Sequence, residues 1–307
     1  MLRSAHIAAD PIQYFNRYTG RLENENVYGH GFLKWTYGNP LGRLGLHALV
    51  KRSAFSRWYG WRMNRARSRA KVAPFISTYK VDRSEFADAP ESYKTFNQFF
   101  YRRLKPGARP IAAGKSVAVF PADGRHLGFQ DISKLGGIFV KGAVFDLRTL
   151  MQSDELAARY RDGSMVLSRL CPVDYHRFHF PVGGVPSAPV TIDGPLYSVN
   201  PIALRRNIHI FSQNKRAYCE IDSPEFGRVL MFEVGATCVG SFEYTYRPGV
   251  AVEKGAEKGY FKFGGSSTIT FFEPGRIRLD ADLVEKARNG VELYARMGDR
   301  MGESKPT

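Results

Sequence analysis

The sequence predicts an α+β protein with a mainly antiparallel β core preceded by amphipathic helices. After Pro110, short runs rich in Val, Ile, Phe and Tyr are separated by Gly, Pro and Asp, which is typical of antiparallel strands joined by tight turns. Before Pro110, apolar residues recur at helical spacing. The chain has 307 residues, 43% hydrophobic and 24% charged, which is enough to bury a substantial core in one large domain, or in one domain with an appendage.

The first helical element lies in a strongly basic block. Residues 41–81 hold ten Lys or Arg and no Asp or Glu. The apolar residues at helical spacing in this block are Leu46, Val50, Ala54, Trp58 and Trp61, with Phe55 and Tyr59 beside them. We expect an amphipathic helix here, aromatic on one face and basic on the other, that begins after the breaker "GNPLG".

The basic helix and the net charge of +16 indicate an anionic partner. A basic helix with Trp and Tyr at its polar–apolar boundary suits a membrane interface, and we favour this interpretation. The second interpretation is a helix that packs on its own domain and leaves its basic face in water. Nucleic acid is the least favoured partner, because no RNA-binding, zinc or helix-turn-helix pattern is present. Residues 1–91 are therefore predicted to form a helical, basic, membrane-associating region.

Residues 92–307 are predicted to form the β-rich domain. Short helices are expected at residues 92–104, where "KPGARP" ends the helix, and at residues 147–163. The expected strands lie in the runs "SMVLSRL", "FHFPVGG", "AYCEI", "RVLMFEVGATCVGSFEYTY", "YFKF" and "STITFF".

The same sequence argues against a secreted or integral protein. No apolar run approaches the roughly 18–20 residues of a membrane span, and the N-terminal "MLRSAHIAADPIQYF" lacks a signal-peptide core. Cys171, Cys219 and Cys238 are odd in number and widely spaced, which indicates buried thiols in a reducing compartment.

Three stretches concentrate reactive side chains. Asp123 lies in "FPADGRH", His176 and His179 lie in "CPVDYHRFHFPVGG", and Ser266 and Ser267 follow two glycines in "YFKFGGSSTITFFEPG". An Asp, a His and a Ser can activate a serine oxygen. No Gly-x-Ser-x-Gly elbow surrounds the serines, so an α/β-hydrolase is disfavoured. The His-x-x-His pair has no further ligand nearby, so a metal site is disfavoured too.

Each of these residues also has a purely structural interpretation. Asp123 can serve a turn, and His179 can fill a core among aromatic neighbours. Gly264 and Gly265 can form the turn of a β-hairpin. His176 would point away from His179 in an extended segment and could converge with it in a turn. The residues alone leave these alternatives open.

The chain resembles the phosphatidylserine decarboxylases, a family of self-cleaving pyruvoyl enzymes, from about Thr95 to Gly302. The motifs that carry the resemblance are "FNQFFYRRLKPGARPI", "PADGR", "CPVDYHRFHFPVGG", "LYSVNPIAL", "NKRAYCEIDSPEFGRVLMFEVGATCVGS", "KGAEKGYFKFGGSSTITFFEPG" and "NGVELYARMGDRMG". Any one of them is weak evidence, but their order along the chain is highly specific.

The resemblance implies a cleavage site at Gly265–Ser266. The family motif Leu-Gly-Ser-Thr corresponds to residues 264–267, with Gly in place of Leu and Ser in place of Thr. Ser267 is an alternative nucleophile, but glycine precedes the scissile bond in the family, and Ser266 alone follows one. Cleavage would give a large chain, 1–265, and a small chain, 266–307, that stay together as a heterodimer.

The resemblance also assigns roles to the reactive residues. Asp123, His179 and Ser266 correspond to the self-cleavage triad, and His176 to the histidine of the decarboxylation and protonation step. Ser266 would become a covalent pyruvoyl group, which forms a Schiff base with the substrate amine and acts as an electron sink. No free cofactor and no metal are implied.

The substrate implied is phosphatidylserine, with phosphatidylethanolamine as product. The alternative is a soluble amino acid such as tryptophan, since the core motifs do not separate the two. The basic aromatic helix favours the lipid. We therefore expect a peripheral protein on an anionic membrane surface, at the cytoplasmic face of a bacterial inner membrane. Homodimerisation is left open.

Overall fold

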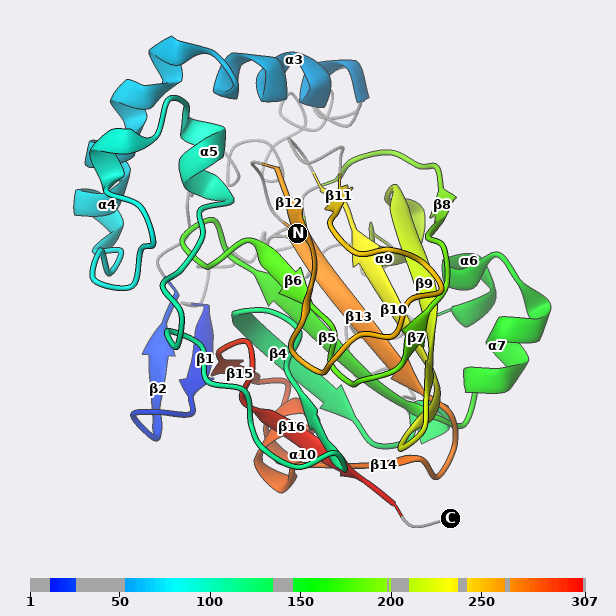
Figure 1. Cartoon of the computed structure of the whole chain (residues 1–307). Coiled ribbons are helices and arrows are strands. Elements are labelled where there is room, and N and C mark those ends of the chain that lie inside the picture. Colours follow the sequence, from blue (N-terminus) through cyan, green and yellow to red (C-terminus); the bar gives the residue numbers. More distant parts are fainter. Residues whose placement is uncertain are drawn as a thin grey trace, which may run out of the picture.

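The protein has the expected α+β architecture, mostly antiparallel strands with few helices (Figure 1). The computed structural model describes residues 12–25, 53–134, 146–197, 199, 210–236, 242–262 and 266–305. Among these residues, no helix is long and apolar enough to cross a bilayer.

A large sheet forms the centre of the molecule. Its strands follow the order β2-β1-β15-β4-β5-β13-β10-β9-β7, and β8 also pairs with β9. The bounds are β1 Gln13–Asn16, β2 Arg21–Asn24, β4 Gly124–Phe129, β5 Ser164–Leu170, β7 Val185–Pro186, β8 Val190–Ile192, β9 Arg216–Ser223, β10 Gly227–Val234, β13 Ser266–Phe272 and β15 Glu292–Ala295. The β1–β15 pair is parallel, and β13 is antiparallel to both of its neighbours.

Two three-stranded sheets accompany the large one. The first has the order β11-β12-β6, with β6 Arg177–His179, β11 Phe242–Tyr244 and β12 Glu257–Phe261. The second has the order β14-β16-β3, with β3 Val117–Val119, β14 Ile277–Leu279 and β16 Arg300–Ser304.

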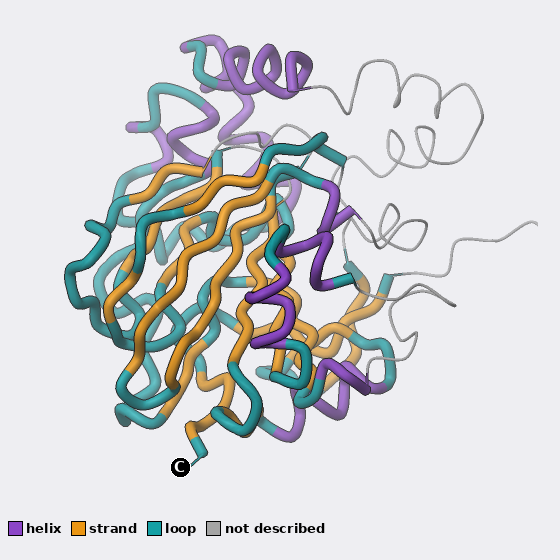
Figure 2. Tube along the Cα trace, turned by 90° about the vertical axis from the view of Figure 1, so that its right-hand side faces the viewer, coloured by secondary structure: helices purple, strands orange, loops and turns teal. Residues whose placement is uncertain are grey.

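The centre of the large sheet is buried on both faces because two different layers cover it. On one face, Ile269 and Phe271 of β13 pack with residues of α6 (Leu147–Met151), α7 (Asp154–Tyr160) and α9 (Ile210–Gln213). On the other face, Phe272 joins Phe178 of β6 and Phe261 of β12 in a second core. Figure 2 shows the long strands side by side, with helices along one side.

Local sequence patterns predicted several elements well. The run "SMVLSRL" is β5 from end to end. The helix expected at residues 147–163 is split, because Gln152 takes a left-handed conformation that ends α6, and Ser153 then caps α7. The helix expected at residues 92–104 is shortened to α5, Phe96–Phe100, with the Thr95 side chain at its N-cap.

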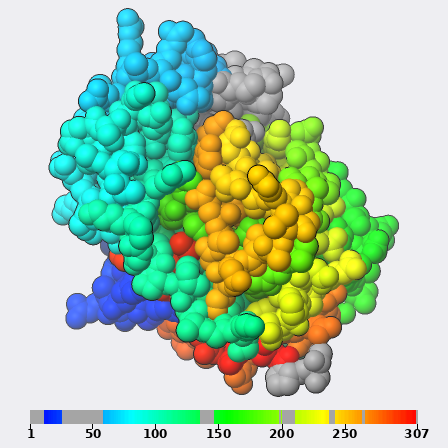
Figure 3. Space-filling model, viewed as in Figure 1, coloured from blue at the N-terminus to red at the C-terminus, as the bar shows by residue number. Residues whose placement is uncertain are grey.

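The N-terminal region is not wholly helical. Residues 13–24 form the β1–β2 hairpin, and β1 joins the large sheet through β15. The helical part consists of α3 (Ser53–Met63), a 3₁₀ turn (Ala66–Lys71), α4 (Val72–Tyr79), the short turn η3 (Pro90–Ser92) and α5. Farther along the chain lie another short turn, η4 (Ile132–Lys134), and the last described helix, α10 (Ala281–Arg288). Figures 1 and 3 show α3, α4 and α5 grouped at one end of the molecule, where a third apolar core unites them.

The expected separation of aromatic and basic faces on the first helix is wrong. Tyr59 and Met63 fill the side that packs inward, whereas Trp58 and Trp61 are 47% and 52% exposed. Arginines share the surface with these indoles: Arg62 lies 5.1 Å from the Trp58 ring, and Arg65 lies above Trp61. Guanidinium groups stack on indoles and keep contact with water, so one face can carry both. Leu46 and Val50 lie outside the described residues.

A buried ion pair joins the two strand layers. Lys258 of β12 donates to Glu233 of β10 at 2.5 Å, and both side chains are fully buried. Tyr244 of β11 donates to the other carboxylate oxygen at 2.9 Å. The carboxylate is therefore compensated by two partners from the small sheet.

We predict that Lys258→Met lowers the free energy of unfolding by about 3–5 kcal/mol, because it leaves a buried carboxylate without its cation. The matched control is Lys262→Met, whose half-exposed pair with Glu243 should be worth about 0–1 kcal/mol. Urea unfolding measures both, in a Ser266→Ala background so that a single chain unfolds. Equal, small losses in the two variants would contradict the prediction.

Candidate active site

Ser266 is the first residue of the central strand β13. Its backbone pairs with Leu170, the last residue of β5. The side chain is fully buried, and in the described part of the chain its Oγ has no hydrogen-bond partner. A buried hydroxyl without a partner is costly in a structural role. Ser267, Thr268 and Thr270 of the same strand share this property, so it makes Ser266 a candidate for chemistry without singling it out.

Ser266 and Ser267 point to opposite faces of the large sheet. Successive side chains of a strand alternate between the two faces. Ser266 therefore shares its face with Phe272, which packs in the core formed with β6 and β12. Ser267 shares its face with Ile269, on the side that the helices cover. The two candidate nucleophiles are thus separated, and Ser266 faces the layer that contains β6.

The chain before Ser266 is not a hairpin turn. Strand β12 pairs with β11 and β6, whereas β13 pairs with β5 and β10, so the hairpin interpretation of Gly264 and Gly265 is wrong. The connection passes from one sheet to another. It starts next to His176, whose carbonyl accepts from the Phe261 amide at 2.9 Å. Gly264 and Gly265 themselves lie outside the described residues.

His176 is held as a neutral base. Its Nδ1 lies 3.0 Å from the Asp174 carbonyl oxygen, and because a carbonyl only accepts, Nδ1 carries the proton. Its Nε2 is buried and has no partner within the described residues. Burial is the main cause that lowers the pKa of His176 to about 3, with the charge of Arg102 adding to it. The ring centroid lies 3.8 Å from that of Phe100.

The turn that orients His176 is fixed by a buried ion pair. Arg125 donates to the Asp174 carboxylate at 2.6 Å, and the Cys171 amide donates to the same oxygen, also at 2.6 Å. Sequence reasoning did not single out either member of the pair, although Arg125 lies in "PADGR" and Asp174 in "CPVDYHRFHFPVGG". Because both residues lie in motifs that carry the family resemblance, the sequence did contain a signal that pointed to them.

His179 has a different set of neighbours. Its Nδ1 lies 3.0 Å from the Gly255 carbonyl oxygen, so Nδ1 carries the proton and Nε2 carries the free lone pair. The Nε2 atom has no hydrogen-bond partner among the residues described. Burial lowers the pKa of His179, whereas the charge of Asp123 raises it. Because His176 and His179 bond separate carbonyl groups, the structure does not bring the two rings into one hydrogen-bonded pair.

Asp123 is bound by an arginine rather than by a histidine. Arg109 donates to its carboxylate through Nε at 2.9 Å and Nη2 at 2.6 Å, and the Met297 amide donates at 2.9 Å. No hydrogen bond joins Asp123 to His179 in the described structure. The two are nevertheless near each other, since the His179 amide donates to Pro121 at 2.8 Å. Arg109, in "KPGARPI", is a further residue that sequence reasoning missed.

The sheet register brings the strand ends together. Arg125 pairs with Arg169, so Gly124 lies opposite Leu170, which in turn pairs with Ser266. A Cβ on Gly124 would lie 2.6 Å from the Arg169 carbonyl oxygen, so the approach is too close for a side chain. With neighbouring strands about 4.8 Å apart, Gly124 and Ser266 are roughly 10 Å from each other.

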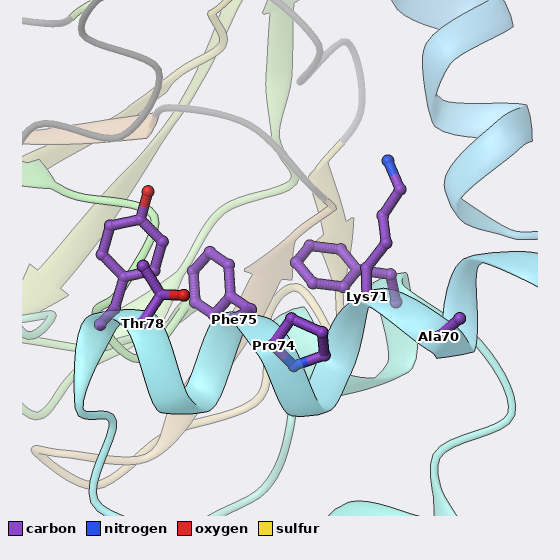
Figure 4. A pocket seen from close by; sticks show the side chains of 7 residues that line it. Ala70, Lys71, Pro74, Phe75 and Thr78 are labelled. Carbon is purple, nitrogen blue, oxygen red and sulfur yellow. The ribbon is translucent and has the colours of Figure 1, made fainter.

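The described residues contain no metal-ligand cluster, and one pocket lies away from Ser266. Within the described ranges, no three His, Cys, Asp or Glu side chains gather as metal ligands would. A pocket of about 330 Å³ opens on the helical part of the molecule, where Pro74 and Phe75 of α4 form part of its wall (Figure 4). The complete lining is Ala70, Lys71, Pro74, Phe75, Thr78, Tyr79 and Phe96.

Comparison with known proteins identifies the family. The phosphatidylserine decarboxylase family model matches residues 96–303. A Fusobacterium nucleatum phosphatidylserine decarboxylase proenzyme is 45% identical over 296 residues, which cover 96% of this chain and 99% of the relative. Proteins of the same name from Chlamydia trachomatis (42%, covering 97% of this chain and 99% of the relative) and Clostridium beijerinckii (42%, covering 95% and 98%) are also similar.

These comparisons place the chain among the carboxy-lyases, in the class of decarboxylases. It belongs to the phosphatidylserine decarboxylase family, and the resemblance inferred from the motifs is confirmed.

The buried histidines make stability depend on pH. Burial lowers the pKa of His126 and of His176 to about 3, from an ordinary value near 6.5. Between these values the unfolded chain binds protons that the folded chain does not, so stability falls as the pH drops below about 6.5.

We predict that His126→Gln reduces this loss by about 1.4 kcal/mol per pH unit, the contribution of one proton. The measurement is urea unfolding of the Ser266→Ala chain, with and without His126→Gln, between pH 6.5 and 4. Carboxylates titrate equally in both proteins and cancel. Identical slopes would contradict the assignment of His126 as neutral.

Proposed function

We propose that this chain is a self-cleaving decarboxylase that converts phosphatidylserine to phosphatidylethanolamine and carbon dioxide at a membrane surface. One observation carries the proposal: the buried, unpartnered Ser266 hydroxyl begins the central strand of a chain in the phosphatidylserine decarboxylase family. The relatives' name, proenzyme, supports maturation by cleavage.

Self-cleavage would use His179 as general base. The Gly255 carbonyl holds the proton on Nδ1, which leaves the Nε2 lone pair to accept the Ser266 proton. Asp123 would support the developing positive charge through space, since its charge raises the pKa of His179. To accept a hydrogen bond from Nδ1–H, as in a serine triad, Asp123 would have to leave Arg109 and replace the Gly255 carbonyl.

Water is the only external reagent that the covalent steps of self-cleavage would consume. The Ser266 oxygen attacks the carbonyl carbon of Gly265, and the C–N bond breaks to give an ester and a free amine. Elimination then breaks the Cβ–O bond of residue 266, and the Gly265 carboxylate leaves. Tautomerisation and hydrolysis of the resulting enamine release ammonia and leave a pyruvoyl group at residue 266.

The small chain would stay bound after cleavage. Residues 266–272 pair with β5 along their whole length, and residues 267–272 pair with β10. Strand β15 of the same segment pairs with β4 and β1. Only the connection before Ser266 would open, which supports a heterodimer of the two pieces.

The residues around Ser266 fit a pyruvoyl group. Its position is buried, and free imidazole lone pairs are available on His179 of β6 and on His176 just before it, in the layer that Ser266 faces. When formed, the group supplies an electron sink for the carbon–carbon bond that breaks. His176 would first accept a proton at Nε2 from the substrate ammonium group and then deliver it to the substrate carbon, while the Asp174 carbonyl would hold its Nδ1–H in place.

A membrane-facing surface on α3 would bring the enzyme to its substrate. Trp58 and Trp61 are about half exposed, and Arg62 and Arg65 lie against their rings. Exposed indoles with adjacent cations suit the headgroup region of an anionic bilayer. The net charge of +16 supports peripheral binding at the cytoplasmic face of a bacterial inner membrane.

We expect Ser266→Ala to abolish both cleavage and activity, whereas Ser267→Ala should still be cleaved, because Ser267 faces the other side of the sheet. Intact mass spectrometry measures the result directly, because cleaved protein yields a fragment of residues 266–307 with a blocked N-terminus. Active protein with one uncut chain would rule out the proposal.

His176→Ala and His179→Ala separate the two proton-transfer roles. The first should be cleaved and lose decarboxylation by at least about 100-fold, and the second should remain uncleaved. The opposite pattern would exchange the roles of the histidines.

The Trp58→Ala, Trp61→Ala double variant should bind anionic vesicles about 10-fold more weakly, because two interfacial indoles are lost. Val250→Ala, on a residue that is 54% exposed in the β-rich part, is the control and should bind as wild type. Co-sedimentation with vesicles rich in phosphatidylserine measures both. Unchanged binding of the double variant would show that the membrane contact lies on another part of the surface.

A further inference from the structure

Arg102 is a buried cation that forms no ion pair with any carboxylate of the described residues. It lies two residues after α5 and is 5% exposed. Its Nε and Nη1 make no hydrogen bond to any described residue, and its Nη2 makes only long contacts, 3.4 and 3.5 Å, to the Val173 and Asp174 carbonyl oxygens. The segments outside the described residues contain a single acidic residue, Asp10.

Other buried arginines near the site have a carboxylate partner or several short hydrogen bonds, although the Nε of Arg125 also lacks a hydrogen-bond partner among the described residues. Arg109, Arg125 and Arg169 each bind a carboxylate at 2.6 Å or less. Arg216 has no carboxylate, but it donates to three backbone carbonyl groups at 2.6–2.9 Å. Arg102 differs from all of these, and leaving its donors unpaired is costly.

The surroundings keep Arg102 charged. Its guanidinium lies 4.9 Å from the Phe86 ring and 5.1 Å from the Phe99 ring, and such contacts stabilise a cation without neutralising it. Burial lowers the pKa of Arg102 to about 10, so the group is protonated at neutral pH. The site therefore offers a preorganised fork of N–H donors for an oxyanion.

Arg102 also lies next to the histidine of the proposed reaction. The Asp174 carbonyl oxygen is the partner of both the Arg102 Nη2 and the His176 Nδ1. The unpartnered Nε2 of His176 and the unpartnered donors of Arg102 thus belong to one neighbourhood.

Phosphatidylserine brings two anions to such a site, a carboxylate and a phosphodiester. A guanidinium paired with the carboxylate would stabilise the group that must leave as carbon dioxide, and so would stabilise the ground state more than the transition state. The phosphodiester keeps its charge throughout. Its phosphorus is three bonds from the carbon that His176 would protonate, within reach of a donor beside that histidine.

We propose that Arg102 binds the phosphodiester of the substrate headgroup and thereby selects a phospholipid over a free amino acid. The proposal rests on the proposed function and deepens it. Because the phosphodiester does not change during the reaction, this contact contributes equally to substrate and transition state and acts mainly on KM.

The test compares Arg102→Met and Arg102→Lys with Arg103→Met, an exposed neighbour. Two substrates are used in detergent micelles: phosphatidylserine, and a serine O-alkyl ether with the same tail but no phosphate. We expect Arg102→Met to be cleaved normally and to raise KM for phosphatidylserine roughly 10- to 100-fold. Arg102→Lys should have a smaller effect, and all variants should turn over the ether as wild type does.

A second measurement does not depend on catalysis. Calorimetric binding of glycerophosphoserine to the uncleaved Ser266→Ala chain should be lost when Arg102→Met is added and kept with Arg103→Met. If wild type binds glycerophosphoserine but has no decarboxylase activity, the proposed function fails while the phosphodiester site stands.

Three results would overturn the inference. Equal losses on the phospholipid and the ether would show that Arg102 positions His176 instead. Unchanged kinetics and binding would show that it meets no ligand. Folded but uncleaved Arg102 variants of both kinds would assign it to maturation.

Discussion

The position of β13 in the middle of the large sheet is the constraint on which the rest of the structure depends. The strand is hydrogen-bonded on both edges, to β5 and β10, and it packs on both faces. Side-chain alternation along it decides that Ser266 and Ser267 face different layers. Its partner at the first position, Leu170, links Ser266 to the turn that leads to His176 and to the strand that follows Asp123.

Around this strand end, charged side chains are buried in compensated groups. Arg109 holds Asp123, Arg125 holds Asp174, and Arg169 joins Glu25 to Glu292. Such pairs are expensive to break, because either partner alone would be a buried charge. The Arg125–Asp174 pair fixes the segment whose carbonyl group orients His176, while burial lowers the pKa of both His176 and His179. The charged groups that hold this region together are thus different residues from the candidate proton carriers.

Sequence patterns located most of the strands and proposed the candidate reactive residues, but they did not give the pairing between strands. The run that became β5 is a continuous apolar segment bounded by turn residues, a signal that local sequence contains. The hairpin interpretation of Gly264 and Gly265 was wrong, and nothing in the local sequences "YFKF" and "STITFF" indicates that the two strands belong to different sheets.

The same limit applies to side-chain partners. Asp123 stood out in its motif, but its hydrogen bond to Arg109 is a tertiary contact. No rule based on sequence spacing predicts a contact between these two residues. Likewise, helical periodicity could not tell that Tyr59 and Met63 would take the inward side of α3 and leave Trp58 and Trp61 outside.

A central strand supplied by the last 42 residues has a consequence for the life of the molecule. Such a strand finds its place only when both neighbours form with it, which is easy for a continuous chain and much harder for two separate pieces. If the chain is cut before Ser266, the cut must follow folding, since the residues that perform it are assembled by the sheet. If a cleaved molecule unfolded, its two chains would have to associate again in a bimolecular step before the central strand could return to the sheet. The protein would then fold only once, and its working lifetime would be set by the rate at which the sheet opens rather than by the equilibrium between folded and unfolded forms.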